Sequence, residues 1–321
     1  MLTCQIDDIC GFIANSRRFS KSHVGFESLT LPGEIMGLLD GKVALVTGAA
    51  VGLGNAFARA LAAEGAALAV CDVRPEISEL VDELTVPVFA RQADVSRSGD
   101  VQHFVEASLQ RFGAIDVLVN NAGSWALSLP DDPIDKSLSD YEKLVGTNLR
   151  GLFLFGRAVM PGMIERGTGE IINISTDHVQ TCGTPFELSH DDAPGCAWAN
   201  EPPRTTGGDE AMDLYDASKW GINGLTLAWS QALAEYGIRV NALCMGATDS
   251  HMLRSFFNFQ PTAEDVAGWM KAADIARLMI DLLREGPEGR TGENIGIAMG
   301  HPIVLPPSRP SPYVILGESV Y

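Results

Sequence analysis

Two side chains that could together move a proton stand four residues apart in the second half of the chain. They are Tyr215 and Lys219, and the residues around them have helical composition. Positions four apart on a helix share one face, with Cβ atoms roughly 5–6 Å apart. Lowering a phenol pKa from about 10 to about 7 requires roughly 4 kcal/mol of preferential stabilisation of the anion. A neighbouring ammonium stabilises a phenolate, so the pair predicts a tyrosine general base. Taken alone, the same spacing is more typical of an exposed surface pair, so this prediction depends on the other motifs of the chain.

A second group of candidates ends a branched apolar run. Residues Ile172–His178 read INISTDH, so Ser175, Thr176, Asp177 and His178 follow one another. A hydroxyl group here could donate a hydrogen bond to a carbonyl oxygen and polarise it. The alternative is an ordinary junction between a strand and a loop.

A glycine-rich turn, TGAAVGLG (Thr47–Gly54), supplies a third candidate site. Gly48, Gly52 and Gly54 permit a tight turn and a close approach of the backbone to a pyrophosphate, and the following helix offers N–H donors. Asp72 ends the next apolar run, where a carboxylate accepts hydrogen bonds from ribose hydroxyls and repels a 2′-phosphate. No basic residue lies in the turn, so we expect NAD rather than NADP, a preference that Arg74 would weaken.

These residues must be positioned by alternating strands and helices. Short, continuously apolar strands that alternate with helices are typical of a parallel sheet covered on both faces. The expected strands are Lys42–Thr47, Ala67–Asp72, Val86–Ala90, Ile115–Asn120, Gly169–Ile174, Arg239–Cys244 and Ile295–Met299. The expected helices are Gly52–Glu64, Glu76–Leu84, Asp100–Phe112, Asp140–Arg166, Met212–Tyr236 and Ala263–Glu285.

Composition narrows the class of protein. The 321 residues carry a formal net charge of −18, and 46% of them are hydrophobic. Such a charge disfavours nucleic acids and anionic membrane surfaces as partners. The six cysteines form no C-x-x-C pair and no metal-ligand spacing, which favours reduced thiols in a cytoplasmic protein. No apolar stretch approaches the length of about 18 residues that spans a membrane.

The chain is expected to divide into three parts. Residues 1–35 are interpreted as a flexible extension, 36–300 as one dehydrogenase domain and 301–321 as an irregular tail. Residues 177–211 are rich in acids, prolines and glycines. They are too long for an ordinary connection, so they predict an inserted loop or lid.

Several motifs in order resemble the short-chain dehydrogenase/reductase family over about residues 40–300. The motifs are the G-x-x-x-G-x-G turn, Asp94-Val95, Asn120-Asn121-Ala122-Gly123, Asn148 in a long helix, and Y-x-x-x-K at Tyr215 and Lys219. The resemblance implies a single Rossmann-type α/β domain. Its doubly wound parallel sheet would have about seven strands, with helices on both faces.

The resemblance also implies roles for individual residues. Thr176, as the second hydroxyl residue after the strand, takes the place of the family's catalytic serine in preference to Ser175. The implied catalytic residues are Asn148, Thr176, Tyr215 and Lys219. The implied cofactor-binding residues are Gly48, Val51, Gly52, Leu53, Gly54, Asp72, Val73, Asp94, Val95, Asn121, Ala122, Gly123, Tyr215, Lys219, Gly246, Thr248 and Ser250. Ser175, His178, Met252 and Phe256 are candidates for contacts with the substrate.

Two departures from the family pattern concern the site. Met245-Gly246 replaces the usual Pro-Gly after a strand, and 38 residues separate Thr176 from Tyr215 where about a dozen are usual. We expect the insertion to lie over the mouth of the active site. The segment Met252–Phe259 suits either an apolar substrate pocket or a helix that packs its core face.

The favoured function is an NAD-dependent oxidoreductase that interconverts a secondary alcohol and a ketone by hydride transfer. The substrate is expected to be small and uncharged or apolar. Hydride transfer of this kind needs no metal, so none is expected at His178, His190, Asp191 and Asp192. The alternatives are a non-catalytic dinucleotide sensor or scaffold, and a lyase or epimerase that uses bound NAD. The resemblance also implies a homodimer or homotetramer through the helices at 140–166 and 212–236.

Overall fold

Seven parallel strands form one sheet in the order β3-β2-β1-β4-β5-β6-β7. In this computed structural model, residues 37–177, 212–297, 299 and 302–308 are described. The strands are β1 (Val43–Thr47), β2 (Ala67–Asp72), β3 (Val88–Gln92), β4 (Val117–Asn120), β5 (Gly169–Thr176), β6 (Ile238–Met245) and β7 (Asn294–Ile297). The expected Rossmann-type fold with seven strands is therefore confirmed. The expected extension 1–35, residues 178–211 of the expected insertion and the tail beyond residue 308 lie outside the described residues.

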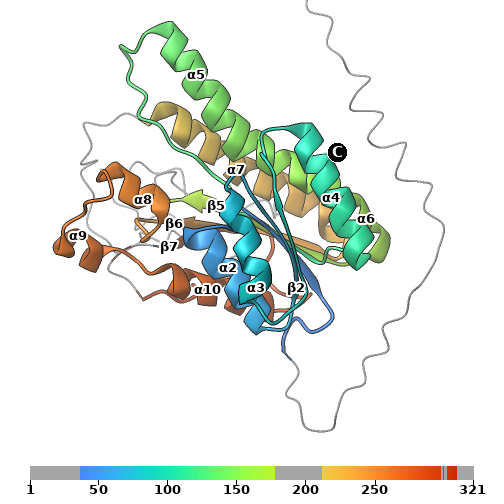
Figure 1. The fold of residues 1–321 in the computed structure, drawn as a ribbon. Coiled ribbons are helices and arrows are strands. Elements are labelled where there is room, and N and C mark those ends of the chain that lie inside the picture. The colour runs from blue at the N-terminus through green and yellow to red at the C-terminus, as the bar shows by residue number, and fades with distance from the viewer. Residues whose placement is uncertain (1–36, 178–211, 298, 300–301, 309–321) are drawn as a thin grey trace, which may run out of the picture. The chain divides into compact units, whose positions relative to one another are not determined.

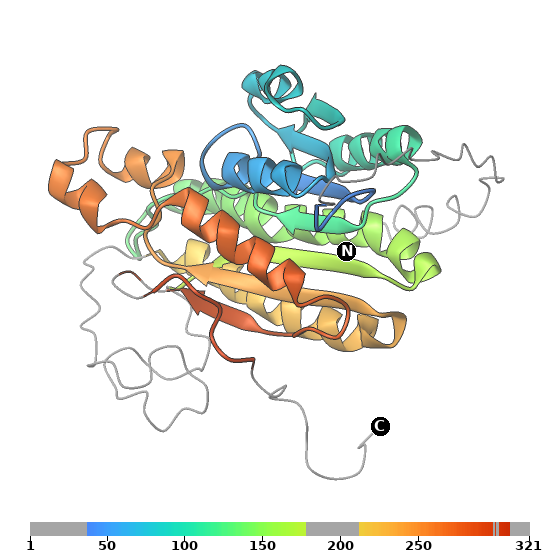
Figure 2. The ribbon, with the colours of Figure 1, turned by 90° about the horizontal axis from the view of Figure 1, so that it is seen from below.

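Helices cover both faces of the sheet (Figures 1 and 2). On one face, α2 (Gly52–Ala63), α3 (Leu80–Glu83) and α10 (Ala272–Arg284) enclose a core with apolar side chains from six of the strands. On the other face, α4 (Ser98–Phe112), α6 (Leu152–Arg166) and α7 (Asp213–Leu233) enclose a second core. Since β1, β2 and β4 are buried on both sides, their sequences are apolar up to the last residue rather than alternating.

The strand order places a crevice at the carboxyl ends of β1 and β4. From β1 the chain continues to β2 and β3 on one side, and from β4 it continues to β5, β6 and β7 on the other. Open α/β sheets bind ligands at the point where the strand order reverses in this way. The register pairs Asn120 with Asn173, and Thr176 with Met245. The residues that end β4, β5 and β6 therefore meet at one edge of the sheet.

The helix expected over Asp140–Arg166 is longer and is interrupted. Helix α5 begins earlier, at Ile134, and ends at Leu144, and the π-helical segment η3 (Val145–Gly151) joins it to α6. A Cβ on Gly151 would lie 2.7 Å from Val95 Cγ2, so the absence of a side chain lets this turn approach the loop after β3. Such π-helical turns are frequently found at functional sites.

Residues Ala263–Glu285, expected to form one helix, instead form two. Helix α9 (Ala263–Gly268) ends before Met270, and α10 begins at Ala272. The N–H of Met270 donates to the Ala247 carbonyl at 3.0 Å, and its carbonyl accepts from the Asp249 N–H at 2.8 Å. The backbone of Met270 is therefore bound to the loop after β6 and is not available for helix bonds. Likewise, the expected helix Glu76–Leu84 is a 3₁₀ turn, η2 (Pro75–Glu79), followed by the short α3.

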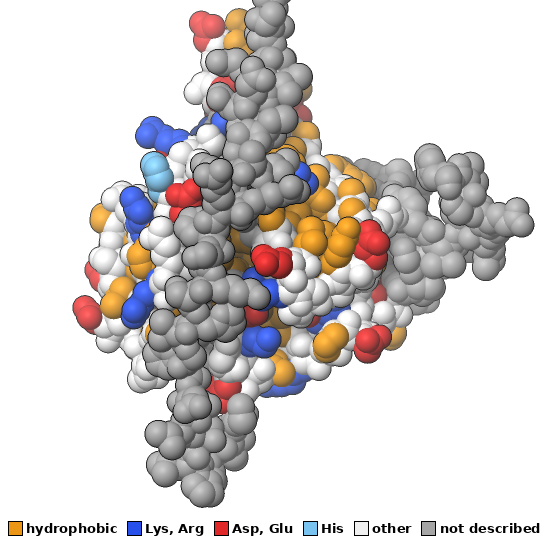
Figure 3. Space-filling model, turned by 90° about the vertical axis from the view of Figure 1, so that its right-hand side faces the viewer, with side chains coloured by type: hydrophobic (Ala, Val, Ile, Leu, Met, Phe, Trp, Pro, Cys, Tyr) orange, Lys and Arg blue, Asp and Glu red, His pale blue; other side chains and the backbone are white. Residues whose placement is uncertain are grey.

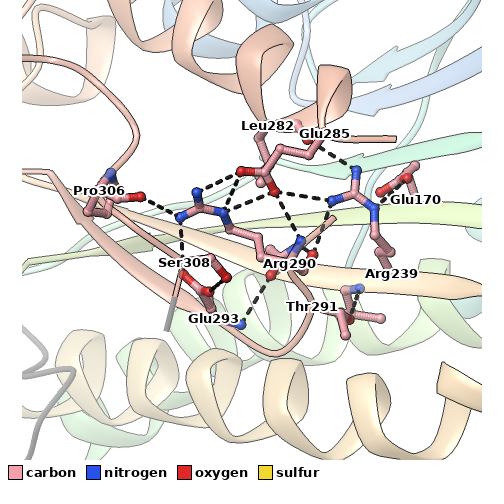
Figure 4. A network of polar contacts seen from close by, with 11 residues as sticks. Glu170, Arg239, Leu282, Glu285, Arg290, Thr291, Glu293, Pro306 and Ser308 are labelled. Carbon is pink, nitrogen blue, oxygen red and sulfur yellow. Dashed lines mark hydrogen bonds and ion pairs between the residues drawn. The ribbon is translucent and has the colours of Figure 1, made fainter. Parts of the chain in front are cut away.

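The amino-terminal edge of the sheet holds a buried network of charges (Figure 4). Arg239, at the start of β6, donates to Glu170 Oε1 at 2.8 Å and to the Leu282 carbonyl at 3.1 Å. Arg290 donates to the Pro306 carbonyl at 2.9 Å, which holds part of the expected tail against the domain. This network binds β5, β6, α10 and the tail to one another at the edge opposite the crevice.

Two features concern the exterior of the described residues. None of the described helices combines the length and apolarity needed to cross a membrane. On the face in Figure 3, acidic, basic and hydrophobic side chains are interspersed.

Candidate active site

The glycine turn between β1 and α2 has the geometry of a backbone cradle. Gly48 and Gly52 have φ values of +66° and +61°, in the left-handed region that favours glycine. A Cβ on Gly54 would overlap the Gly48 carbonyl oxygen, so the helix can follow the strand this closely only with glycine there. The turn therefore fits a dinucleotide pyrophosphate. Val51 and Leu53, expected to contact the cofactor, lie in the same turn and at the start of α2.

Asp72 stands at the end of β2 beside this turn. Its carboxylate accepts hydrogen bonds from the N–H groups of Ala50 and Arg74, each at 3.0 Å. These bonds hold the carboxylate next to the glycine turn, where an adenosine ribose would lie in a Rossmann-type site. Val73, also expected to contact the cofactor, is 57% exposed.

Two other expected cofactor segments follow the carboxyl ends of β4 and β3. The Asn121 side chain donates to the carbonyls of Thr47 and Gly48, each at 3.0 Å, and the Ala122 N–H donates to Thr47 Oγ1 at 3.0 Å. These bonds fasten the loop after β4 to the glycine turn. Asp94 accepts from Ser96 at 2.6 Å and pairs with Arg97, while Val95 is buried.

Tyr215 and Thr176 meet at the carboxyl edge of the sheet. Their side chains share a hydrogen bond, although 38 residues separate them in the chain. Lys219 lies one turn further along α7, with its Nζ 5.6 Å from the centre of the Tyr215 ring. Its ammonium donates to the Ile174 carbonyl at 3.0 Å and is almost fully buried. The structure thus brings three of the four expected catalytic residues together.

Electrostatics at Tyr215 act in opposing directions. Burial is the main influence that raises the pKa of this phenol, and the carboxylates of Asp216 and Asp177 act in the same direction. The hydrogen bond with Thr176 acts to lower it. Burial lowers the pKa of Lys219 to about 8, so this group is mostly charged at neutral pH. Sequence reasoning assigned no electrostatic role to Asp177 or Asp216.

Asn148, the fourth expected catalytic residue, is buried in η3. Its Oδ1 accepts from the Ser124 N–H at 2.7 Å, and its Nδ2 donates to Ser218 Oγ at 3.0 Å. Ser218 in turn donates to the Tyr215 carbonyl at 2.6 Å. Asn148 therefore joins the loop after β4 to the first turns of α7. It is connected to Tyr215 through the backbone rather than through the phenol.

The Ser175 side chain lies between α7 and β6. Its hydroxyl donates to the Lys219 carbonyl at 3.4 Å and also contacts the buried Cys244. Thr176 is the hydroxyl that shares a hydrogen bond with the phenol, and its preference over Ser175 as a catalytic residue stays a prediction. His178 lies outside the described residues.

Comparisons with known proteins agree with this geometry. A family model described as short chain dehydrogenase matches residues 42–183 and 206–261. The chain belongs to the short-chain dehydrogenase/reductase family. Oxidoreductase UcpA of Escherichia coli (strain K12) is 30% identical over 265 residues, covering 82% of this chain and 86% of that protein. The 3-oxoacyl-[acyl-carrier-protein] reductase FabG of Thermotoga maritima is 30% identical over 270 residues, covering 82% and 98%.

A solved relative extends the similarity to three dimensions. The 3-ketoacyl-(acyl-carrier-protein) reductase from Brucella melitensis, crystallised with NADH, superimposes with a TM-score of 0.64. It is 28% identical, and the match covers 82% of this chain and 98% of that one. Short-chain dehydrogenases use NAD or NADP, and this chain is an oxidoreductase that acts on alcohol or carbonyl groups.

The loop after β6, where the usual Pro-Gly is missing, keeps a defined conformation. Gly246 donates its N–H to the Ile297 carbonyl at 2.9 Å, and a Cβ on it would lie 2.6 Å from Asp177 Oδ2. Thr248 is buried and donates to the Gly246 carbonyl at 3.0 Å. Ser250 caps helix α8 (His251–Phe256), and its Cβ lies 3.4 Å from the Cβ position of Gly52. The loop that carries the expected cofactor residues Gly246, Thr248 and Ser250 thus runs from the end of β6 to the glycine turn.

Helix α8 also packs against the loop after β4. The Met252 Cε lies 3.7 Å from the Cβ position of Gly123, and the Phe256 ring packs on Trp125 with centroids 3.8 Å apart. The expected substrate residues Met252 and Phe256 therefore face the loop after β4. Sequence reasoning did not include Trp125 among the candidate site residues. Its position two residues after the Asn-Asn-Ala-Gly motif could have identified it as a neighbour of the site. Within the described ranges, no group of His, Cys, Asp or Glu side chains could hold a metal ion.

Proposed function

We propose that this short-chain dehydrogenase interconverts an uncharged secondary alcohol and its ketone, with NAD as the preferred cofactor and Tyr215 as the acid–base group. The observation that carries the proposal is the contact of the Tyr215 and Thr176 side chains at the carboxyl edge, with Lys219 one turn away. The reductase names of several relatives support a carbonyl group as the reacting centre.

The chain's own residues divide the chemistry between them. Thr176 donates a hydrogen bond to the reacting oxygen and orients it toward Tyr215. In the oxidation direction the Tyr215 phenolate accepts the hydroxyl proton and becomes the phenol, and in reduction the phenol returns that proton to the oxygen. The nicotinamide ring, when bound, accepts or donates the hydride. Lys219 holds a positive charge near the phenol, and the Ile174 carbonyl keeps its ammonium in place.

The preference for NAD rests on Asp72. Its carboxylate is buried and held beside the glycine turn by two backbone N–H groups. A second negative charge from a 2′-phosphate would meet this carboxylate directly. The neighbouring Arg74 donates its backbone N–H to Asp72, and its side-chain charge moderates the repulsion. A higher kcat/KM with NAD than with NADP supports this preference, and the reverse order contradicts it.

The replacement Tyr215→Phe tests the proposal. Turnover of secondary alcohols should fall by at least a thousandfold, because the hydroxyl proton loses its acceptor while the phenyl ring still fills the site. The dissociation constant for NAD should change by less than about threefold. Tyr236→Phe, at an exposed tyrosine near the opposite edge, is the matched control.

Two outcomes would contradict this function. Near-normal turnover by the Tyr215→Phe variant would show that Tyr215 is not the acid–base group. Tight binding of NAD by the unmodified protein, without hydride exchange on a broad panel of alcohols and ketones, would instead favour a dinucleotide sensor.

The proposal extends to a homodimer or homotetramer. It is supported by an apolar groove of about 370 Å³ between η3, α6 and α7, lined by Val145, Leu149, Arg150, Phe153, Gly221 and Leu225. Phe153 is 41% exposed there, and a second copy of the chain is the expected occupant. A monomeric mass in light scattering at micromolar concentration would contradict it.

A further inference from the structure

Trp125 is fixed in the loop after β4 by two side chains of α8. Its indole N–H donates to Ser255 Oγ at 2.9 Å, and its ring packs edge-on against Phe256 at an interplanar angle of 61°. Ser255 and Phe256 lie three and four positions after Met252, so all three share one face of the helix. This face of α8 is therefore directed at the loop that carries Gly123 and Trp125.

The same loop is fixed to the catalytic residues. Asn148 binds both the N–H and the carbonyl of Ser124, at 2.7 and 3.0 Å. The Cβ position of Gly123 lies 3.5 Å from Asn148 Oδ1 and 3.7 Å from Met252 Cε. Since Trp125 is the next residue after Ser124, its ring stands at the border between Asn148 and α8. Its position is determined from both sides of the site.

The surface that this aromatic pair leaves open is apolar. Ser255 already accepts the single polar hydrogen of the indole ring. Phe256 remains 39% exposed, and Trp125 is partly exposed. The exposed parts of this pair are therefore ring faces and ring edges, which favour contact with another flat apolar group. The polar groups nearest to Trp125 in the loop are the buried Ser124 hydroxyl and the Lys143 ammonium, which donates to the Trp125 carbonyl at 3.2 Å.

We propose that Trp125, with Phe256, is a specificity-determining residue that binds an apolar ring next to the reacting carbon of the substrate. The substrate class is then an aryl or cyclic secondary alcohol or its ketone, rather than a short acyclic one. This inference rests on the proposed oxidoreductase function and adds the substituent that the site selects.

The test compares an aryl and an acyclic substrate in the unmodified enzyme and in Trp125→Leu. The kcat/KM for 1-phenylethanol should fall about tenfold to a hundredfold in the variant, the size expected for losing an apolar pocket contact. The kcat/KM for 2-butanol should change by less than about twofold. Ser255→Ala keeps both aromatic rings but removes the hydrogen bond that holds the Trp125 indole. The ratio of kcat/KM for 1-phenylethanol to that for 2-butanol should therefore fall, but by less than in Trp125→Leu. Tyr236→Leu, at an exposed aromatic residue near the opposite edge, should leave the ratio unchanged.

Binding is measured in parallel, by NMR titration with acetophenone and 2-butanone. In Trp125→Leu, the dissociation constant for acetophenone should rise by about tenfold, and that for 2-butanone should not change. An equal loss for both ligands, in a variant that melts like the unmodified enzyme, would show that Trp125 merely supports the loop. If neither alcohol is turned over but the binding difference persists, the ring site stands and the proposed oxidoreductase function fails.

Discussion

At the scale of single residues, Tyr215 lies in a less favourable electrostatic setting than its spacing from Lys219 suggests. The sequence predicts that an ammonium one turn away lowers the phenol pKa. In the structure, burial and the carboxylates of Asp216 and Asp177 act to raise it, and the Thr176 hydrogen bond opposes them. Because Asp177 immediately follows Thr176, its carboxylate lies close enough to Tyr215 to raise the pKa of the phenol.

This arrangement predicts the direction of a pH shift. In Asp177→Asn, a negative charge near the phenol disappears, so the phenolate is less disfavoured and the pKa of Tyr215 falls. The acidic limb of the pH profile of kcat/KM for alcohol oxidation should therefore move to lower pH, with activity near pH 6–7 rising severalfold. Glu79→Gln removes an exposed charge from η2 and serves as the control. An unchanged or alkaline-shifted limb would contradict the influence of Asp177.

Residue types and local spacing were sufficient to predict some of these residues but not others. Tyr215, Lys219 and the glycine turn belong to short motifs whose members are close in the sequence. The contact of Trp125 with Ser255 spans 130 positions, and no local pattern encodes it. The influence of Asp216 also required the structure, because an acid in the first turn of a helix is an ordinary capping feature.

At the scale of elements, contacts with the loop after β4 hold the first turn of α7 in place. Such contacts are needed because a long segment separates α7 from Thr176 at the end of β5. Ser128 in the loop after β4 forms a parallel bridge with Met212, and its hydroxyl donates to Asp213. Asp213 opens α7 two residues before Tyr215, and Ser128 is buried. This contact therefore positions the first turn of the helix that carries Tyr215.

The replacement Ser128→Ala tests that role. Without the hydroxyl, the first turn of α7 should be held less closely, and small displacements of reacting groups can lower rates by about a hundredfold. We expect kcat to fall about tenfold or more, with little change in NAD affinity, because the glycine turn is untouched. Ser128→Thr keeps the hydroxyl and should restore most of kcat. If Ser128→Ala retains full kcat, the start of α7 is positioned by other contacts.

Element boundaries illustrate where sequence patterns fail. The expected helix Ala263–Glu285 contains no proline at the break between α9 and α10, and Met270 within the break is buried. What ends the helix is a pair of backbone hydrogen bonds to the loop after β6. Periodicity reports which side chains are buried, whereas the bonding partners of the backbone depend on distant segments.

At the scale of the whole molecule, the two edges of the sheet have different functions. The carboxyl edge holds the glycine turn, Thr176 and Tyr215, which the family motifs predict together with the fold. The amino edge holds the buried network around Arg239. No sequence motif predicted this network. Arg239 bonds to Glu170, Leu282 and Arg290, which lie up to 69 positions away in the chain.

The replacement Arg239→Lys separates these two edges experimentally. Arg239 is only 3% exposed, and its planar guanidinium reaches Glu170 and the carbonyls of Leu282 and Arg290 at once. A lysine ammonium is a point charge that cannot span these partners. Buried polar groups would be left unpaired, so the free energy of unfolding should drop by about 2–4 kcal/mol.

The kcat of the folded Arg239→Lys variant should stay within about twofold of the unmodified enzyme, because the site lies at the other edge of the sheet. Arg284→Lys is the matched control on α10, where the arginine side chain is 49% exposed. Its unfolding free energy should change by no more than about 0.5 kcal/mol. Denaturant unfolding together with steady-state rates checks both values. A purely structural network at the amino edge would leave Tyr215 and Thr176 in position when it is weakened. A large loss of kcat in folded Arg239→Lys would therefore mean that changes at the amino edge displace residues at the carboxyl edge.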